Sequence, residues 1–318
     1  MSVIPIFDLH SDILIDISRT YTRTSHKSGK SLDEWQAIMK CGNVLGRVLS
    51  VWIEEVYKPG NTLKRALDLI SIAKREIKRL NNAILVLNGK DLEKFGSNEG
   101  FYYVISLEGA DPIYDDILLL DVFYNLGVRL ITLTWSTRNF IADGVFESRT
   151  RGGLTRFGLE LLERIKELGV IVDLSHISDF GFWDVIENFD GPVMASHSNS
   201  RTVHDNPRNL TDEQAKAIAE RGGIVGLNVI PNFVGLNKDL ESFMKHLEHF
   251  VDIIGIDHVA FGFDFVYYIY NDYKGLNGLS TERDLPKLIS RLLENYTREE
   301  VEKVCWRNAI SFIGSNLK

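Results

Sequence analysis

His10 and Asp12 lie two positions apart at the end of a short apolar run near the start of the chain. If this run is a strand, the two side chains point to the same face, with their Cα atoms about 6 to 7 Å apart. An imidazole nitrogen and a carboxylate oxygen at this spacing can bind one metal ion together. The pair also fits a second interpretation, in which Asp12 caps the following helix and His10 is an ordinary surface histidine.

Four further residues that bind metals or transfer protons each follow an apolar run: Glu108, His176, His197 and Asp264. Any one of them alone fits a simple role in hydrogen-bonding a loop. With the first pair they make six, and histidine nitrogens together with carboxylate oxygens suit Zn²⁺ or a similar transition metal. Two such ions about 3.5 to 4 Å apart can share a hydroxide as nucleophile and polarise the bond under attack.

Eight apolar runs rich in β-branched residues predict the strands that position these groups. They cover residues 3–9, 48–53, 102–107, 129–133, 170–174, 192–196, 224–228 and 258–263. Stretches of helical period separate them, and this alternation favours a (β/α)8 TIM barrel over a doubly wound sheet. We expect a single barrel domain over residues 1–318, with the six groups at the carboxyl ends of its strands, where barrel enzymes place their chemistry.

Apolar periodicity predicts the helices that surround these strands. They cover residues 62–70, 159–168, 211–221 and 239–254, and extra C-terminal helices at 282–293 and 297–313 either complete the outer ring or form a subunit contact. Thr211 precedes a first-turn acid and fits a helix start. The connections 18–40 and 142–153 are long enough to cover an active site. His246 and His249 are expected at the surface of a helix.

The composition is that of a globular protein with ample core and without affinity for nucleic acid. Of the 318 residues 44% are hydrophobic, and the formal net charge of -8 suits a divalent metal or a cationic substrate better than phosphate groups. The sequence lacks a secretory signal, and it lacks an apolar stretch of the ~20 residues that a membrane span needs. We therefore expect a cytoplasmic protein that does not bind membranes. Cys41 and Cys305 form no CxxC pattern, which argues against a disulfide framework or a cysteine metal site.

Six short motifs follow one another over most of the chain. They are Asp8-Leu9-His10-Ser11-Asp12, Leu107-Glu108-Gly109, Asp173-Leu174-Ser175-His176, Ser196-His197-Ser198, Arg208-Asn209 and Gly262-Phe263-Asp264-Phe265. Each motif is weak by itself. In this order, however, the set resembles the membrane dipeptidase (renal dipeptidase) family of binuclear zinc peptidases, which belongs to the amidohydrolase-like barrels of metallo-dependent hydrolase type.

The resemblance implies a centre with two Zn²⁺ ions, although other divalent transition metals also suit these ligands. By position, His10 and Asp12 would bind one ion and His176 and His197 the other, with Glu108 bridging the two. The implied activity is hydrolysis of the peptide bond of a small dipeptide through a metal-bridging hydroxide. The resemblance also suggests a homodimer.

Two residues near the proposed metals would handle the substrate. The resemblance implies that Arg208 holds the terminal carboxylate, for which a planar guanidinium is suited. It also implies that Asp264 takes a proton from the bridging water and delivers it to the leaving amine. The sequence departs from the family at Trp135, where better-known members have a histidine that contacts the scissile group. We expect Trp135 to contact the substrate and to change the substrate range.

Two other functions fit the same residues. One is hydrolysis of another small amide, an ester or a lactone, because related barrels change substrate through their loops. The other is a catalytically weak barrel whose metals only stabilise the fold while its surface binds a partner. That interpretation leaves Asp264 and Arg208 without a role, so we favour the metallo-dipeptidase.

Overall fold

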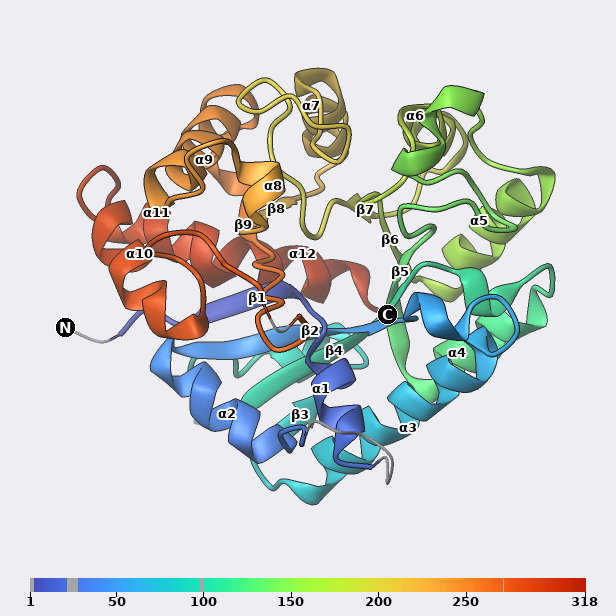
Figure 1. Cartoon of the computed structure of the whole chain (residues 1–318), viewed down its shortest axis with the longest axis horizontal. Helices are drawn as coiled ribbons and strands as arrows, with labels where there is room; N and C mark the ends of the chain where they lie inside the picture. Colours follow the sequence, from blue (N-terminus) through green and yellow to red (C-terminus); the bar gives the residue numbers. More distant parts are fainter. Residues whose placement is uncertain (1–2, 22–27, 98–99, 271) are drawn as a thin grey trace.

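The computed structural model describes residues 3–21, 28–97, 100–270 and 272–318 (Figure 1). Within these ranges the chain forms nine strands, which are β1 (Ile6–Ser11), β2 (Val44–Trp52), β3 (Ala83–Leu85), β4 (Phe101–Glu108), β5 (Val128–Thr132), β6 (Ile171–Asp173), β7 (Val193–Met194), β8 (Val225–Leu227) and β9 (Val259–Phe261). Each predicted strand overlaps one of these, and only the ends differ. The short β3, which pairs with β4, has no counterpart in the sequence prediction.

The strands pair in parallel and curl round a common axis. Their order is β1-β2-β4-β5-β6-β7, and β8 pairs with β9. A parallel bridge between Ala195 and Val225 joins β7 to β8. On the other side, the Phe263 amide donates a hydrogen bond of 2.9 Å to Asp8 Oδ1, which links the end of β9 to β1. The result is the predicted (β/α)8 barrel, with the carboxyl ends of its strands at one rim (Figure 1).

Alternate residues of each strand face two different apolar cores. On β1, Phe7 and Leu9 belong to the core inside the barrel, whereas Ile6 belongs to the core under the surrounding helices. The other strands add to the inner core Val48, Tyr102, Val104, Leu130, Ile171, Met194 and Ala260, all at most 1% exposed. Because side chains fill the barrel, the rim above them is a rigid support for a site.

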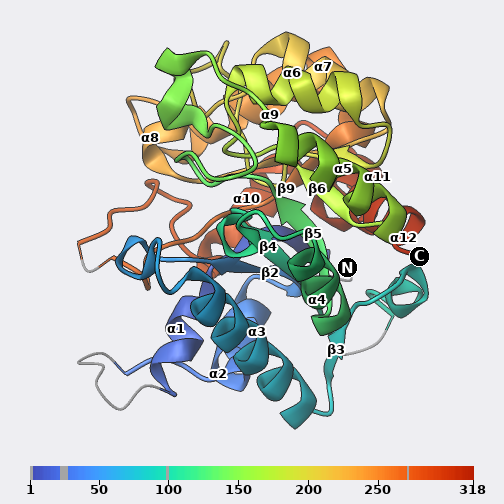
Figure 2. The same cartoon turned by 90° about the vertical axis from the view of Figure 1, so that its right-hand side faces the viewer.

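Helices enclose the strands, as Figure 2 shows, with α1 to α3 on one side and α6, α7 and α9 on the other. Their bounds are α1 (Ile13–Arg19), α2 (Leu32–Cys41), α3 (Thr62–Arg79), α4 (Leu118–Leu126), α5 (Arg156–Leu168), α6 (Asp179–Asn188), α7 (Asp212–Glu220), α8 (Pro231–Val234), α9 (Leu240–Ile254), α10 (Leu285–Leu292), α11 (Arg298–Glu302) and α12 (Asn308–Asn316). The predicted cap at Thr211 is confirmed, because its hydroxyl accepts from the Gln214 amide. The two predicted C-terminal helices correspond to α10 and to α11 with α12, which a π-helical turn at Lys303–Arg307 connects.

The prediction that residues 18–40 form one covering loop is wrong in part. Helix α1 extends to Arg19, and α2 begins at Leu32 after a capping box between Ser31 and Glu34. Trp35 on α2 is fully buried and donates to Asp16 Oδ2 on α1 at 3.1 Å. This buried contact holds the two helices together. Residues 22–27 of the predicted loop lie outside the described residues.

His246 on α9 is also placed differently from the prediction. It is fully buried rather than at the surface, and its Nδ1 accepts from the Ser200 amide at 3.1 Å while its Nε2 lies 2.9 Å from the Val234 carbonyl. His249 remains partly exposed and contacts Asp212. Among the described residues, none of the helices has both the length and the apolar character needed to cross a membrane.

Candidate metal centre

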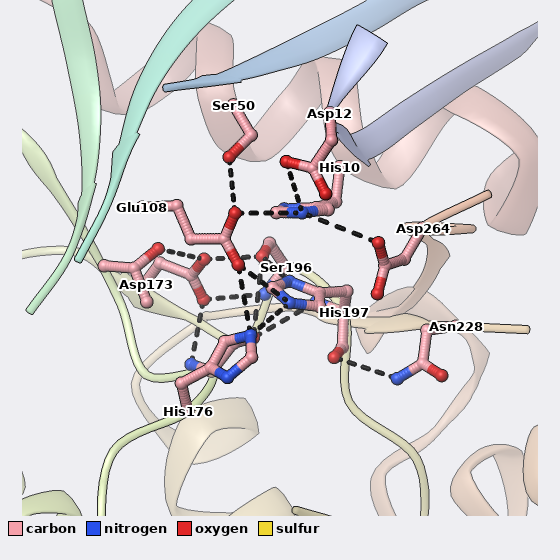
Figure 3. A network of polar contacts seen from close by, with 12 residues as sticks. His10, Asp12, Ser50, Glu108, Asp173, His176, Ser196, His197, Asn228 and Asp264 are labelled. Atoms are coloured by element: carbon pink, nitrogen blue, oxygen red, sulfur yellow. Dashed lines mark hydrogen bonds and ion pairs between the residues drawn. The ribbon is translucent and has the colours of Figure 1, made fainter. Parts of the chain in front are cut away.

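The barrel rim brings together the six groups that the sequence singles out (Figure 3). His10 Nε2 lies 3.4 Å from Glu108 Oε2, and 3.9 Å from both Asp12 Oδ1 and Asp264 Oδ1. His10 lies on β1 and Glu108 at the end of β4. Asp12 follows β1, and Asp264 follows β9. One imidazole nitrogen is therefore surrounded by three carboxylates, and an imidazole with neighbouring carboxylates can bind a divalent cation.

The other oxygen of Glu108 faces a second group of nitrogens. Glu108 Oε1 lies 3.1 Å from His176 Nε2 and 3.8 Å from His197 Nε2. The two Nε2 atoms are themselves only 2.9 Å apart. The rings of His10 and His197 stack with their centroids 3.7 Å apart, so the two halves of the centre adjoin. Glu108 thus lies between two clusters of nitrogen and oxygen atoms.

The position of Asp12 decides between the two interpretations of the first motif. Asp12 occupies the N-cap position of α1, but its side chain makes no capping hydrogen bond. Its Oδ1 and the Nε2 of His10 are instead buried without a hydrogen-bond partner. Buried polar atoms without partners are costly, and a bound cation would satisfy both. The interpretation of Asp12 as a side-chain cap is wrong, and the residues present fit a metal.

A serine fixes the orientation of His197. The Ser196 hydroxyl donates to Asp173 Oδ2 at 2.5 Å, and its oxygen lies 2.6 Å from His197 Nδ1. Because the single hydroxyl hydrogen is already donated to a carboxylate, the hydrogen between Ser196 and His197 belongs to Nδ1. The Nε2 of His197 therefore presents a lone pair to the centre. Hydrogen bonds of this kind orient metal-binding histidines in proteins.

Asp173 is held by its own set of donors, and similar short side chains support the other ligands. The backbone amides of Ser175 and Ser196 donate to Asp173 Oδ1 at 3.0 and 2.9 Å. The Ser50 hydroxyl donates to Glu108 Oε2 at 2.6 Å, and Ser136 Oγ lies 2.9 Å from His176 Nδ1. None of these residues was assigned a supporting role from the sequence, although Asp173, Ser175 and Ser196 belong to its motifs. Short polar residues at or just beyond the ends of predicted strands are the pattern that would have indicated them.

Two of the rim residues have a backbone conformation that side chains rarely adopt. The φ angle is +70° at His176 and +55° at Asp264, both in the left-handed region. Such conformations cost about 1 to 3 kcal/mol and persist only where the surrounding structure enforces them. Here they turn the two side chains into the centre at the points where β6 and β9 give way to loops.

Burial and mutual repulsion perturb the three carboxylates differently. Burial would raise the pKa of Glu108, but His10, His176 and the Ser50 hydroxyl together lower it to about 2. Burial raises the pKa of Asp12 and of Asp264 well above the usual range, and the negative charge of Glu108 adds to both shifts. Bringing a cation to the centre would favour the charged forms of all three.

The histidines are kept neutral by their surroundings. Burial and the charge of Arg208 lower the pKa of His176 to about 4, although Glu108 opposes them. Burial also lowers the pKa of His10, and it moves the pKa of His197 well below its usual value. A neutral imidazole is the form that binds a metal. Three imidazoles ready to act as ligands therefore meet at this rim.

Arg208 lies in the loop between β7 and α7 and is only 5% exposed. Its Nη1 donates to Ser198 Oγ at 2.8 Å and its Nη2 to the His197 carbonyl at 2.9 Å. A guanidinium has five N–H donors, so three remain, and Nε has no partner. Burial lowers its pKa to about 10, so the group is cationic at neutral pH. Arg208 is thus a positioned cation with donors available for an anion.

A cavity of about 570 Å³ opens above these groups. Asp12, Glu108, His176, Arg208 and Asp264 all contribute to its lining. Trp135 lines it too, as does the segment 142–153 through Val145 and Phe146. The size is typical of pockets that bind small molecules. Six of the sequence-predicted residues therefore share one cavity, while His10 and His197 lie beneath its lining.

A parallel barrel with a histidine and carboxylate cluster at the carboxyl rim defines the class of metal-dependent hydrolases. The family model described as membrane dipeptidase (peptidase family M19) matches residues 1–315. The chain belongs to this family of metallo-dipeptidases, which implies a metal cofactor.

The chain is also similar to curated relatives in sequence and to a solved structure in fold. An uncharacterized protein in the pqqA 5' region of Klebsiella pneumoniae is 31% identical over 239 residues, covering 70% of this chain and 85% of that protein. An uncharacterized dipeptidase of Schizosaccharomyces pombe is 28% identical, covering 79% of this chain and 62% of that protein. The fold resembles that of a metallopeptidase from Rhodobacter sphaeroides liganded with a phosphinate mimic of the dipeptide L-Ala-D-Ala, with a TM-score of 0.86, 23% identity and full coverage of both chains.

Proposed function

We propose that the protein is a zinc-dependent dipeptidase that hydrolyses the peptide bond of small dipeptides. The observation that carries the proposal is the position of Glu108, whose two carboxylate oxygens face separate clusters of ligand atoms within 3.4 Å of His10 and 3.1 Å of His176. Arg208 lines the same cavity. A two-metal centre beside a buried cation suits a small substrate that has a free carboxylate.

In this proposal two Zn²⁺ ions would be held by five of the six rim groups, with Asp264 left for proton transfer. His10 and Asp12 would hold one ion and His176 and His197 the other, with Glu108 shared between them. Ions held in this way lower the pKa of a water molecule and polarise the carbonyl under attack. The supporting serines keep the lone pairs of the histidines directed at the ions.

The remaining steps belong to two side chains of this chain. Arg208 binds the terminal carboxylate of the dipeptide and so fixes which bond lies over the centre. Asp264 accepts the proton of the attacking water and passes it to the leaving amine. Its position supports this role, because Asp264 lines the cavity and its Oδ1 lies 3.9 Å from His10 Nε2.

The direct test is a substrate panel on zinc-loaded protein. Dipeptides, N-acyl amino acids and lactones are assayed side by side, and the proposal predicts hydrolysis of dipeptides at the highest kcat/KM. Preference for an ester, a lactone or an acylated amide would instead support the alternative hydrolase. Absence of hydrolysis on the whole panel would contradict both.

Variants then test the two side chains. Asp264→Asn should lower kcat for dipeptides about 100- to 10,000-fold, because a positioned proton donor contributes about that much, and it should leave the zinc content unchanged. Asp190→Asn is the matched control, since that carboxylate is 75% exposed in its side chain and distant in the fold.

Arg208→Ala should raise KM for free dipeptides more than for amidated ones. Equal effects on both substrates would remove Arg208 as the carboxylate-binding residue.

A further inference from the structure

Three aromatic side chains form one side of the cavity, and we call Trp52, Trp135 and Phe146 the aromatic wall. The ring centroids of Trp52 and Trp135 are 5.9 Å apart, and those of Trp135 and Phe146 are 5.8 Å apart with the rings nearly perpendicular. All three line the cavity above the metal centre. Contacts of this geometry are favourable between aromatic rings, so the wall is a continuous apolar surface rather than three separate side chains.

The sheet places the wall directly beside Glu108. Trp52 is the residue of β2 that pairs with Glu108 on β4, and Trp135 lies just beyond the end of β5, the other neighbour of β4. Gly109 allows this close approach, because a Cβ atom there would lie 3.1 Å from the Trp135 amide nitrogen. The ring of Trp135 also lies 5.8 Å from that of His176. A group bound at the centre therefore meets the wall.

Arg208 lies across the barrel mouth from Trp52, whereas Trp135 follows β5, which β6 alone separates from β7. Arg208 follows β7, and around the barrel three strands separate β7 from β2 in each direction, namely β4, β5 and β6 on one side and β8, β9 and β1 on the other. A dipeptide whose carboxylate binds Arg208 and whose peptide carbonyl lies at the centre must extend its amino-terminal residue away from β7. In this orientation that residue would meet the aromatic wall first at Trp52.

A lysine closes the outer end of the wall. Lys58 Nζ lies 5.5 Å from the centroid of Trp135, and it is 3.4 Å from both Glu55 Oε1 and Asp111 Oδ1. Its side chain is only 12% exposed. A cation already bound on the ring face leaves no room there for a second one. The rest of the wall is apolar and suits a neutral, apolar group.

We propose that the aromatic wall makes the enzyme selective for dipeptides with a large apolar or aromatic amino-terminal residue. This inference rests on the proposed dipeptidase function and specifies its substrate class. Burying such a side chain against three rings contributes binding that glycine or alanine cannot supply. Trp135 is then a specificity-determining residue, which accounts for an indole at a position where the resembling family has a histidine.

The test compares three dipeptides on zinc-loaded protein: Phe-Ala, Gly-Ala and the reversed Ala-Phe. The expected kcat/KM for Phe-Ala exceeds that for Gly-Ala by about tenfold or more, as burial of one large apolar side chain typically allows. Equal or better hydrolysis of Gly-Ala would overturn the inference while leaving the dipeptidase function intact. Preference for Ala-Phe over Phe-Ala would overturn the assignment to the amino-terminal residue. Absence of hydrolysis of all three would overturn the dipeptidase function and this inference with it.

Two variants locate the preference in the wall. Trp135→Ala and Phe146→Ala should each lower the ratio of kcat/KM for Phe-Ala to that for Gly-Ala, by about three- to tenfold. Phe146 is 67% exposed, so its removal does not endanger folding. Phe180→Ala on α6 is the matched control, because this phenylalanine is 48% exposed and is not part of the wall. A ratio that falls equally in the control, or in neither wall variant, would contradict the proposal.

Discussion

A serine hydroxyl determines which nitrogen of His197 faces the centre. Ser196 donates its only hydroxyl hydrogen to Asp173, so it accepts one from His197 Nδ1 and leaves Nε2 free as a ligand. The serine therefore acts on metal binding through the imidazole, without contacting a metal itself. This arrangement joins β6 to β7 beneath the centre. It predicts that Ser196 affects zinc binding although it is not a proposed ligand.

Ser196→Ala should weaken zinc binding by about 10- to 100-fold, the usual effect of losing such a supporting hydrogen bond. Competition with a chromophoric chelator measures the affinity. Ser290→Ala is the control, since that hydroxyl donates only to a carbonyl of its own helix α10. Unchanged zinc affinity in Ser196→Ala would show that the position of His197 is fixed by packing alone.

At the scale of elements, the strands were predictable and several of their supports were not. Apolar runs followed by a histidine or carboxylate indicate the rim, because parallel strands must end together. The roles of Ser50 and Asp173 depend on which strands are neighbours, and sequence periodicity carries no such information. Helix α2 was missed although its capping residues, Ser31 and Glu34, are readable in the sequence. The burial of His246 depends on packing between distant segments.

His246 makes stability depend on pH, because α9 contacts the loop after β7 and the end of α8 through this imidazole. Burial lowers the pKa of His246 to about 4, whereas an unfolded histidine has a pKa of about 6.5. Between these values the unfolded state takes up the proton first. The free energy of unfolding should therefore fall as pH drops from about 6.5 to 4, by at most about 3 kcal/mol from this residue.

Chemical denaturation over this pH range measures the effect against His246→Gln, which keeps an acceptor and a donor but cannot be protonated. The difference in stability between wild type and variant should decrease as the pH falls, since other buried histidines contribute equally to both proteins. His249→Gln on the same helix controls for the change of residue type. A difference independent of pH would show that His246 is already protonated in the folded state or is solvated there.

At the scale of the whole molecule, a buried ion network closes the barrel. Arg47 on β2 is fully buried, and its Nη2 lies 3.1 Å from Asp8 Oδ2 on β1 and 2.9 Å from Glu282 Oε1 before α10. Glu282 also accepts a hydrogen bond from Tyr267 in the loop after β9. The network joins the first strands to the C-terminal third of the chain where β1 and β9 lack a backbone ladder.

Arg47→Met should lower the free energy of unfolding by about 3 to 5 kcal/mol, because two buried carboxylates lose their cation. The double variant Arg47→Met with Glu282→Gln should be less destabilised than the sum of the single variants, since the two residues interact directly. Denaturant unfolding measures all three proteins. Additive losses, or a loss below about 1 kcal/mol for Arg47→Met, would show that the barrel closes without this network.

The most direct measurement is a zinc titration of chelator-treated protein with dipeptide hydrolysis as the readout. The metal-free protein should be inactive, and activity should rise to its maximum at two equivalents of Zn²⁺. His10→Ala and Asp12→Asn should lower zinc content and activity together. Full activity without metal, or unchanged zinc content in both variants, would contradict the proposed two-metal centre.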